Sequence, residues 1–262
     1  MNAALKKRVI TAAILIPLLI LAIFYAPAYF FMIMIMVVFA ACAYEGASLL
    51  MPAHSTPQKG FFAAFVALSI FVISPKAPAL ALLAVGFWGG VLGFFMKSSW
   101  RDALKRPHIA LPVLWLCLVP AACSVWFLRS HFSPETLLAI LLVVFASDTA
   151  AYFVGKRFGT TKLAPMISPG KTRAGFLGGV IGAALAGLIL SPFLSHSFCA
   201  SILLSILIAL VGTWGDLFES ILKRVANVKD SGKLLPGHGG LLDRMDSLFA
   251  VLPVVLAIKV LL

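Results

Sequence analysis

The chain has 262 residues, of which 62% are hydrophobic and 11% are charged, and its formal net charge is +12. A water-soluble domain with this composition would expose too much apolar surface. The apolar runs are unbroken over about 20 residues, whereas barrel strands alternate over about ten. The sequence therefore predicts an all-α, polytopic membrane protein.

The apolar runs predict nine transmembrane helices, separated by prolines and short polar segments. The first five would form an N-terminal scaffold over residues 1–132. Residues 133–262 would form a catalytic region with two cytoplasmic loops, 156–173 and 223–245. The expected helices cover residues 9–25, 28–50, 60–74, 77–96, 108–128, 134–155, 174–191, 197–222 and 246–262.

The positions of the basic residues orient these helices. Lys6, Lys7 and Arg8 precede the first one and predict a cytoplasmic N-terminus. With nine crossings, 18 of the 21 lysine and arginine residues then face the cytoplasm. The net positive charge thus follows from the positive-inside rule, and no nucleic-acid partner is expected.

Of the nine acidic residues, Asp148 and Asp216 draw attention because of their depth in expected membrane helices. Asp148 is eight residues before Lys156, and Asp216 is seven residues before Lys223, so both lie roughly 10–12 Å from the cytoplasmic ends of their helices. A carboxylate at that depth needs a cation, a proton or a polar partner. Both are candidate site residues; the alternative is a buried ion pair with a lysine or arginine.

Asp216, Glu219, Ser220 and Lys223 follow the i, i+3, i+4, i+7 spacing of one helix face. A polar face in an apolar helix predicts a cavity that this face lines. An ordinary ion pair at the end of the helix is the alternative.

The second loop is rich in glycine and charge. Gly239 and Gly240 allow a backbone to approach phosphate oxygens closely. Asp243 and Asp246 follow at i, i+3 spacing where the last helix opens, although Asp246 could serve only as a helix cap. Other candidate phosphate-binding residues in and beside this loop are Ser220, Arg224, Lys229, His238 and Arg244.

The first loop ends in Ser168-Pro169-Gly170-Lys171-Thr172, directly before an expected helix. Backbone N–H groups, a hydroxyl and an ammonium at a helix N-terminus form a plausible anion cradle. The segment lacks the GxxxxGK[ST] spacing of a P-loop. Ser168, Lys171 and Thr172 are candidate phosphate-binding residues, with a simple helix cap as the alternative.

Carboxylates that gather with phosphate-binding groups at one membrane face indicate Mg²⁺ chemistry. The expected substrate therefore carries phosphates and comes from the cytoplasm. The apolar surroundings indicate that the second substrate is a lipid.

The charged C-terminal stretch resembles the signature of the phosphatidate cytidylyltransferases, also called CDP-diacylglycerol synthases. The resemblance is firm over about residues 145–250. It rests on Ser147–Tyr152, Ser168–Thr172, Ser220-x-Leu222-Lys223-Arg224, Lys229-Asp230-x-Gly232 and Leu235-Pro236-x-His238-Gly239-Gly240-Leu241-x-Asp243-Arg244-Met245-Asp246.

The resemblance implies that CTP and phosphatidic acid react to give CDP-diacylglycerol and pyrophosphate, with Mg²⁺ held by Asp216 and Asp243 and K⁺ as a further cation. It also implies a homodimer. We expect Asp148 and Asp246 to act as further ligands or orienting groups. Lys171, Lys223 and Arg224 would neutralise phosphate charge. The plain positive-inside pattern suits a bacterial inner membrane, with the site facing the cytoplasm.

Three other functions compete with this interpretation. Asp148 and Asp216 could form the proton relay of a transporter, although the polar residues gather at one face and no internal repeat is visible. An enzyme could transfer a nucleotidyl or phosphoryl group to another lipid, such as a polyprenol or an ether lipid. A non-catalytic lipid-binding scaffold would not need so many carboxylates.

Overall fold

The structure is a computed structural model that describes residues 3–95, 101–195, 197–232, 234 and 239–261. Over these residues its regular secondary structure is helical apart from one antiparallel hairpin, β1 (Lys162–Ala164) and β2 (Ser168–Thr172). The long helices are α1 (Ala3–Tyr25), α2 (Ala28–Leu50), α3 (Thr56–Ile73), α4 (Ala77–Phe95), α6 (Pro107–Phe127), α7 (Pro134–Phe158), α8 (Arg173–Ile189), α10 (Phe198–Val225) and α11 (Leu242–Leu261). The short ones are η1 (Ser74–Lys76), η2 (Asp102–Lys105), η3 (Leu128–Phe132) and α9 (Ser191–Leu194).

Each of the nine expected apolar runs coincides with one long helix, which confirms the all-α prediction. By length and composition, five helical stretches of the described chain could cross a membrane: 28–50, 56–91, 107–132, 134–158 and 198–225. A helical membrane protein is therefore supported. Nine crossings and a cytoplasmic N-terminus stay predictions.

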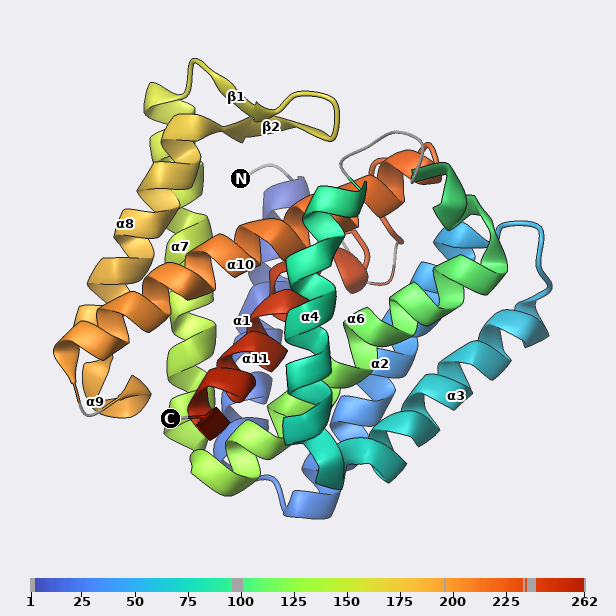
Figure 1. The fold of residues 1–262 in the computed structure, drawn as a ribbon, viewed down its shortest axis with the longest axis horizontal. Helices are drawn as coiled ribbons and strands as arrows, with labels where there is room; N and C mark the ends of the chain where they lie inside the picture. Colours follow the sequence, from blue (N-terminus) through green and yellow to red (C-terminus); the bar gives the residue numbers. More distant parts are fainter. Residues whose placement is uncertain (1–2, 96–100, 196, 233, 235–238, 262) are drawn as a thin grey trace.

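Helix α11 forms the centre of the core, and α2, α4, α6 and α10 pack around it (Figure 1). Every residue from Ser247 to Ala257 is buried. Aromatic rings join the helices: Phe39 meets Phe249 at 6.1 Å between centroids, and Trp88 meets Phe218 at 5.6 Å, both edge to face. The two aspartates that open α11 are thus attached to the most enclosed helix of the protein.

Helices α7 and α8 pack in close contact, because glycines on α8 remove side chains from the interface. A Cβ at Gly178 would lie 2.5 Å from the Cβ of Val154, and one at Gly175 would lie 2.8 Å from the carbonyl oxygen of Ala151. Small residues are the usual means of bringing membrane helices together. This packing supports the β1–β2 hairpin, which connects the two helices (Figure 1).

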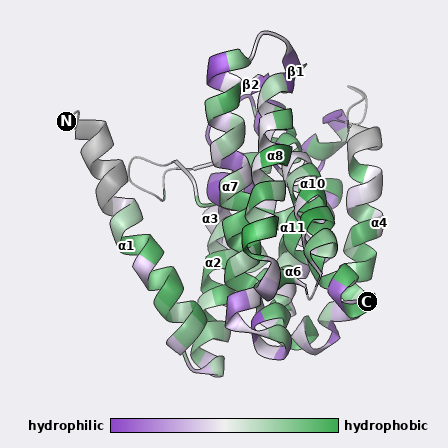
Figure 2. Ribbon diagram, turned by 90° about the vertical axis from the view of Figure 1, so that its left-hand side faces the viewer, coloured by the Kyte–Doolittle hydropathy of each residue, from purple (hydrophilic) through white to green (hydrophobic). Residues whose placement is uncertain are grey.

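The outer surface of the helices is largely apolar, and hydrophilic residues gather near the ends of the molecule (Figure 2). Large apolar side chains such as Phe61, Phe71 and Leu203 are more than half exposed. An exposed apolar belt is what lipid tails require. The start of α1, the β1–β2 hairpin and the loop after α10 lie at the same end of the molecule (Figure 1).

Candidate active site

The C-terminal end of α10 fixes the position of the first basic residues. Asn227 has a φ of 56°, in the left-handed region that commonly ends helices. The N–H of Val228 then donates to the carbonyl oxygen of Lys223, and the N–H of Asn227 donates to that of Arg224, at 3.0 and 3.1 Å. The helix therefore stops sharply after Lys223 and Arg224.

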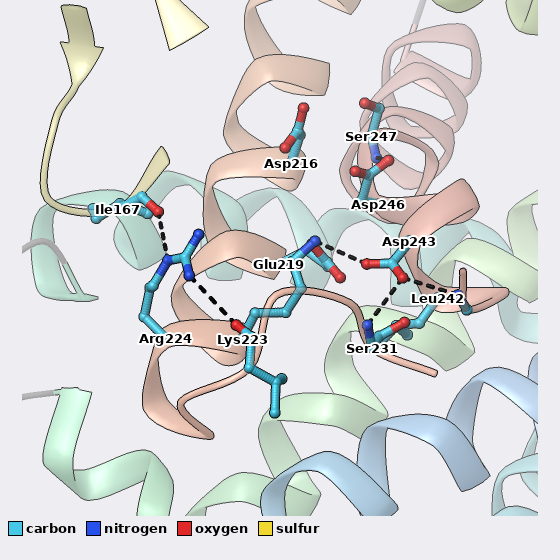
Figure 3. A network of polar contacts seen from close by, with 12 residues as sticks. Ile167, Asp216, Glu219, Lys223, Arg224, Ser231, Leu242, Asp243, Asp246 and Ser247 are labelled. Atoms are coloured by element: carbon cyan, nitrogen blue, oxygen red, sulfur yellow. Dashed lines mark hydrogen bonds and ion pairs between the residues drawn. The ribbon is translucent and has the colours of Figure 1, made fainter. Parts of the chain in front are cut away.

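Lys223 joins two acidic side chains from different helices (Figure 3). Its Nζ lies 2.5 Å from Glu219 Oε2 on the same helix and 2.8 Å from Asp243 Oδ1 on α11. The exposed fractions of the three side chains are 14%, 2% and 6%, in the order Lys223, Glu219 and Asp243. Burial of charge requires a close counter-charge, so this triad fixes α10 against the start of α11.

Asp243 is bound at both carboxylate oxygens. Lys223 donates to Oδ1, while the backbone N–H groups of Ser231 and Gly240 donate to Oδ2 at 2.9 and 3.0 Å. Burial acts to raise the pKa of Asp243, but these hydrogen bonds to the charged form outweigh it and lower the pKa to about 2. Asp243 is thus a fixed anion that also holds the backbone at Ser231 and Gly240.

A second cluster lies further along the same two helices. Lys171 of β2 forms an ion pair with Asp216 of α10, with 2.5 Å between Nζ and Oδ2. Asp148, Asp216 and Lys171 all interact electrostatically with Asp246 of α11. Figure 3 shows Asp216 and Asp246 on facing parts of α10 and α11. Four segments of the chain, α7, β2, α10 and α11, therefore contribute charge to one region.

A glycine allows α10 and α11 to approach here. A Cβ at Gly215 would overlap the carbonyl oxygen of Asp246 and would lie 3.2 Å from the Cβ of Ala250. The absence of a side chain at Gly215, next to Asp216, lets the two acidic segments lie side by side. The sequence pattern alone did not reveal this contact.

The carboxylates fit a hard cation in their chemistry. Asp148, Asp216 and Asp246 carry three carboxylates against the single ammonium group of Lys171, and oxygen ligands are those that Mg²⁺ prefers. In the described ranges, no group of three His, Cys, Asp or Glu side chains is arranged to hold a metal ion. Here ammonium groups, from Lys171 and Lys223, lie against the carboxylates of Asp216 and Asp243.

For the hairpin residues, the structure shows the helix cap that was the alternative to phosphate binding. Thr172 is buried, and its Oγ1 accepts a hydrogen bond from the N–H of Gly175 at 3.0 Å, so it caps α8. Ser168 is only partly buried at the start of β2. Arg224 extends from α10 to this hairpin, and its Nε donates to the carbonyl oxygen of Ile167 at 3.1 Å. In this structure, Arg224 therefore holds the hairpin to the end of α10.

The remaining expected residues lie around the second loop. Gly239 has a φ of +88°, a conformation that side chains disfavour, and a Cβ there would lie 3.1 Å from Asp243 Oδ2. Lys229 and Arg244 are exposed, whereas Ser220 is buried. His238 lies outside the described residues. The N–H of Gly240 points to Asp243, and a phosphate-binding role for Gly239 and Gly240 stays a prediction.

Glu45 is an acidic residue that lies beside the candidate site and that the sequence analysis did not identify. It lies on α2, in the expected scaffold, yet its Oε2 accepts a hydrogen bond from the N–H of Leu242 at 2.9 Å. Glu45 is the only acidic residue of the apolar run 28–50. The rule that drew attention to Asp148 and Asp216, that an ionisable residue in a membrane helix marks function, would also have identified it.

A cavity of about 750 Å³ lies away from these residues, near α9 and the end of α11. Its lining is mostly apolar and includes Phe193, Leu203 and Lys259. None of the charged residues of the two clusters borders it. The candidate site is therefore defined by its charges and not by this cavity.

The chain is similar in sequence to a known family and to several known proteins. The model of the Cytidylyltransferase family matches residues 6–262. A phosphatidate cytidylyltransferase of Haemophilus influenzae is 32% identical over 95% of this chain and 96% of its own length. The one from Pseudomonas aeruginosa is 35% identical over 97% and 96%. An uncharacterised protein of Escherichia coli, YnbB, is 36% identical over 76% of this chain and 60% of its own length.

Proposed function

This chain belongs to the Cytidylyltransferase family and transfers a cytidylyl group from CTP to phosphatidic acid, and we propose that the two charge clusters between α10 and α11 carry out this transfer. The products are CDP-diacylglycerol and pyrophosphate. Near full-length matches to two phosphatidate cytidylyltransferases, over 95% and 97% of the chain, support the reaction. The location of the site between α10 and α11 is supported by four charged residues that interact there: Asp148, Lys171, Asp216 and Asp246.

In this proposal, a phosphate oxygen of phosphatidic acid attacks the α-phosphorus of CTP. A new P–O bond forms, and the bond to the pyrophosphate leaving group breaks. Because the attacking oxygen is already anionic, the reaction needs no strong general base. Catalysis then depends on bringing two anions together and stabilising the charge on the phosphorus.

The lysines provide the positive charge for this step. Lys171 and Lys223 each lie against a carboxylate in this structure, with exposed fractions of 24% and 14%. In the proposal, both border the region that phosphate groups would enter. Each ammonium could donate to a phosphate oxygen while Asp216 or Asp243 keeps it oriented. Three further basic residues would add positive charge beside the phosphate site: Arg224, Lys229 and Arg244. The residues proposed to line the phosphate site are Ser168, Thr172, Ser220, His238, Gly239 and Gly240.

Mg²⁺ is part of the proposal, with Asp216 and Asp243 as its ligands and Asp148 and Asp246 close by. The excess of carboxylates over ammonium groups near Asp216 supports it. When bound, such a cation neutralises phosphate charge and polarises the reacting phosphoryl group. A monovalent cation such as K⁺ is proposed to share this region.

The arrangement in the membrane is also proposed. Nine crossings with a cytoplasmic N-terminus would place the β1–β2 hairpin and the 223–245 loop at the cytoplasmic face of a bacterial inner membrane. Support comes from the 18 of 21 basic residues that fall on that side and from the shared end of the molecule in Figure 1. A homodimer is expected by family resemblance.

The reaction is tested by incubating the purified protein with CTP labelled in the cytidine, Mg²⁺ and phosphatidic acid. We expect label in the lipid and equimolar pyrophosphate, and loss of both when a chelator removes Mg²⁺. Polyprenyl phosphate offered in place of phosphatidic acid should remain unlabelled. Label in the polyprenyl lipid, with none in phosphatidic acid, would show that the lipid substrate is a different one.

A further inference from the structure

Glu45 connects the N-terminal helices to the catalytic end of α11. Its side chain is 7% exposed, and its Oε2 accepts the N–H of Leu242, the first residue of α11. Asp243 is the next residue. A carboxylate that accepts a free N–H at a helix start stabilises that start through the hydrogen bond and through the helix dipole. Glu45, 197 residues away in sequence, thus caps the helix that carries Asp243.

The loop before α11 is shaped around this carboxylate. A Cβ at Gly232 would overlap Glu45 Oε1, and a Cβ at Gly240 would lie 2.8 Å from Glu45 Oε2. Glycine at these two positions leaves the space that the Glu45 side chain occupies. The loop segments at 231–232 and 240 therefore enclose Glu45.

The same two segments bind Asp243. Ser231 and Gly240 donate their N–H groups to Asp243 Oδ2. A displacement of Glu45 would therefore move three groups at once: the start of α11 and both N–H donors. The hydrogen bond from the N–H of Leu242 to Oε2 is the contact that holds Glu45 against this part of the backbone.

We propose that Glu45 is a positioning residue of the cytidylyl transfer, which holds the start of α11 and the backbone at 231–232 and 240 so that Asp243 and Lys223 keep their mutual geometry. The inference rests on the proposed role of Asp243. It makes α2, a helix with no other expected site residue, part of the catalytic apparatus. Glu45 itself does not contact substrate in this role.

The first test compares kinetics with folding. Glu45→Ala removes the cap, and we expect kcat per folded molecule to fall about a hundredfold, the loss that a displacement of about 1 Å can cause, with a smaller change in KM. Glu45→Gln keeps an acceptor oxygen and should recover part of that loss. Glu135→Gln, an exposed acid on α7, is the matched control and should behave as wild type. A lower melting temperature for Glu45→Ala with unchanged kcat would overturn the proposal.

The second test exchanges volume between contacting residues. Gly232→Ala should be strongly impaired, because its methyl group needs the space of Glu45 Oε1. Shortening the acid in the double variant Glu45→Asp/Gly232→Ala should raise kcat above that of Gly232→Ala alone. Gly60→Ala, where a Cβ meets nothing within 4 Å, is the control for glycine replacement. If the double variant is no more active than Gly232→Ala, the inferred contact between position 232 and Glu45 is wrong.

A third variant separates this inference from the proposed site. Asp243→Asn should be inactive whatever Glu45 does. If Asp243→Asn keeps full activity, the proposed function of Asp243 is wrong. If Asp243→Asn is inactive while Glu45→Ala and Glu45→Gln both keep the wild-type kcat, only the role of Glu45 is wrong.

Discussion

Lys171 of strand β2 forms an ion pair with Asp216 of helix α10, with 2.5 Å between Nζ and Oδ2. The pair connects the hairpin between α7 and α8 to the helix that also carries Lys223. The exposed fractions are 24% for Lys171 and 29% for Asp216, so ligands can reach both side chains. A salt bridge with this exposure contributes little stability, which makes a role in substrate or cation binding the better explanation of the pair.

Asp216→Asn should therefore abolish turnover without unfolding the protein. The amide keeps the shape but loses the charge that orients Lys171 and attracts a cation. We expect activity to fall by at least about a hundredfold, as for loss of a preorganised electrostatic group. Lipid-dependent pyrophosphate release measures this, with the melting temperature in detergent as the folding control. Near-normal activity in folded Asp216→Asn would remove this residue from the mechanism.

Lys223→Ala should reduce both stability and activity. Its ammonium is the shared counter-charge of Glu219 and Asp243, whose side chains are 2% and 6% exposed. Removing one partner of a buried charge network costs about 3–5 kcal/mol of unfolding free energy. Unfolding monitored by circular dichroism against denaturant would show this loss.

The double variant Lys223→Ala/Glu219→Ala is the matched control for that loss. Because it deletes a buried acid along with its counter-charge, it should be more stable than Lys223→Ala alone. If Lys223→Ala is as stable as wild type, the triad of Lys223, Glu219 and Asp243 contributes nothing to the stability of the fold. For Lys223→Ala, the accompanying kinetic expectation is weaker phosphate binding, measured as a raised KM for CTP and lipid.

Arg224→Lys should loosen the hairpin although it keeps the charge. The Nε of Arg224 donates to the carbonyl oxygen of Ile167, and an ammonium group cannot reproduce the geometry of the guanidinium. We expect faster proteolysis at the exposed Met166 and a raised KM for CTP. Limited proteolysis with and without CTP measures the first effect. Unchanged cleavage together with an unchanged KM would contradict this role.

Gly178→Ala should separate α7 from α8. The added methyl would lie 2.5 Å from the Cβ of Val154, and overpacking of this kind costs about 1–3 kcal/mol. Gly86→Ala on α4 is the matched control, since a Cβ there meets nothing within 4 Å. It should be neutral, or more stable by about 0.5–1 kcal/mol through helix propensity. Melting temperatures of the two variants in detergent would distinguish these effects, and equal values would contradict the close packing of α7 against α8.

Several features could be predicted from the sequence because they depend on local pattern. Unbroken apolar runs require internally satisfied backbone groups in lipid, so every expected run became a helix. The scarcity of acids within those runs made Asp148 and Asp216 conspicuous. The motif around Lys223 and Asp243 was sufficient to indicate a family, which the match over residues 6–262 confirmed.

Pairing between distant residues was decided only by the tertiary structure. Sequence spacing placed Glu219 and Lys223 on one helix face, but it could not show that Lys223 also binds Asp243, or that Thr172 caps α8. The contact of Glu45 with Leu242 spans 197 positions and depends on glycines at 232 and 240 that leave room for it. The sequence therefore determined which segments form apolar helices and which residues carry charge. The packing of α11 among α2, α4, α6 and α10 determined which charges meet, because contact distance in a packed core depends on the shapes of all the neighbouring helices together.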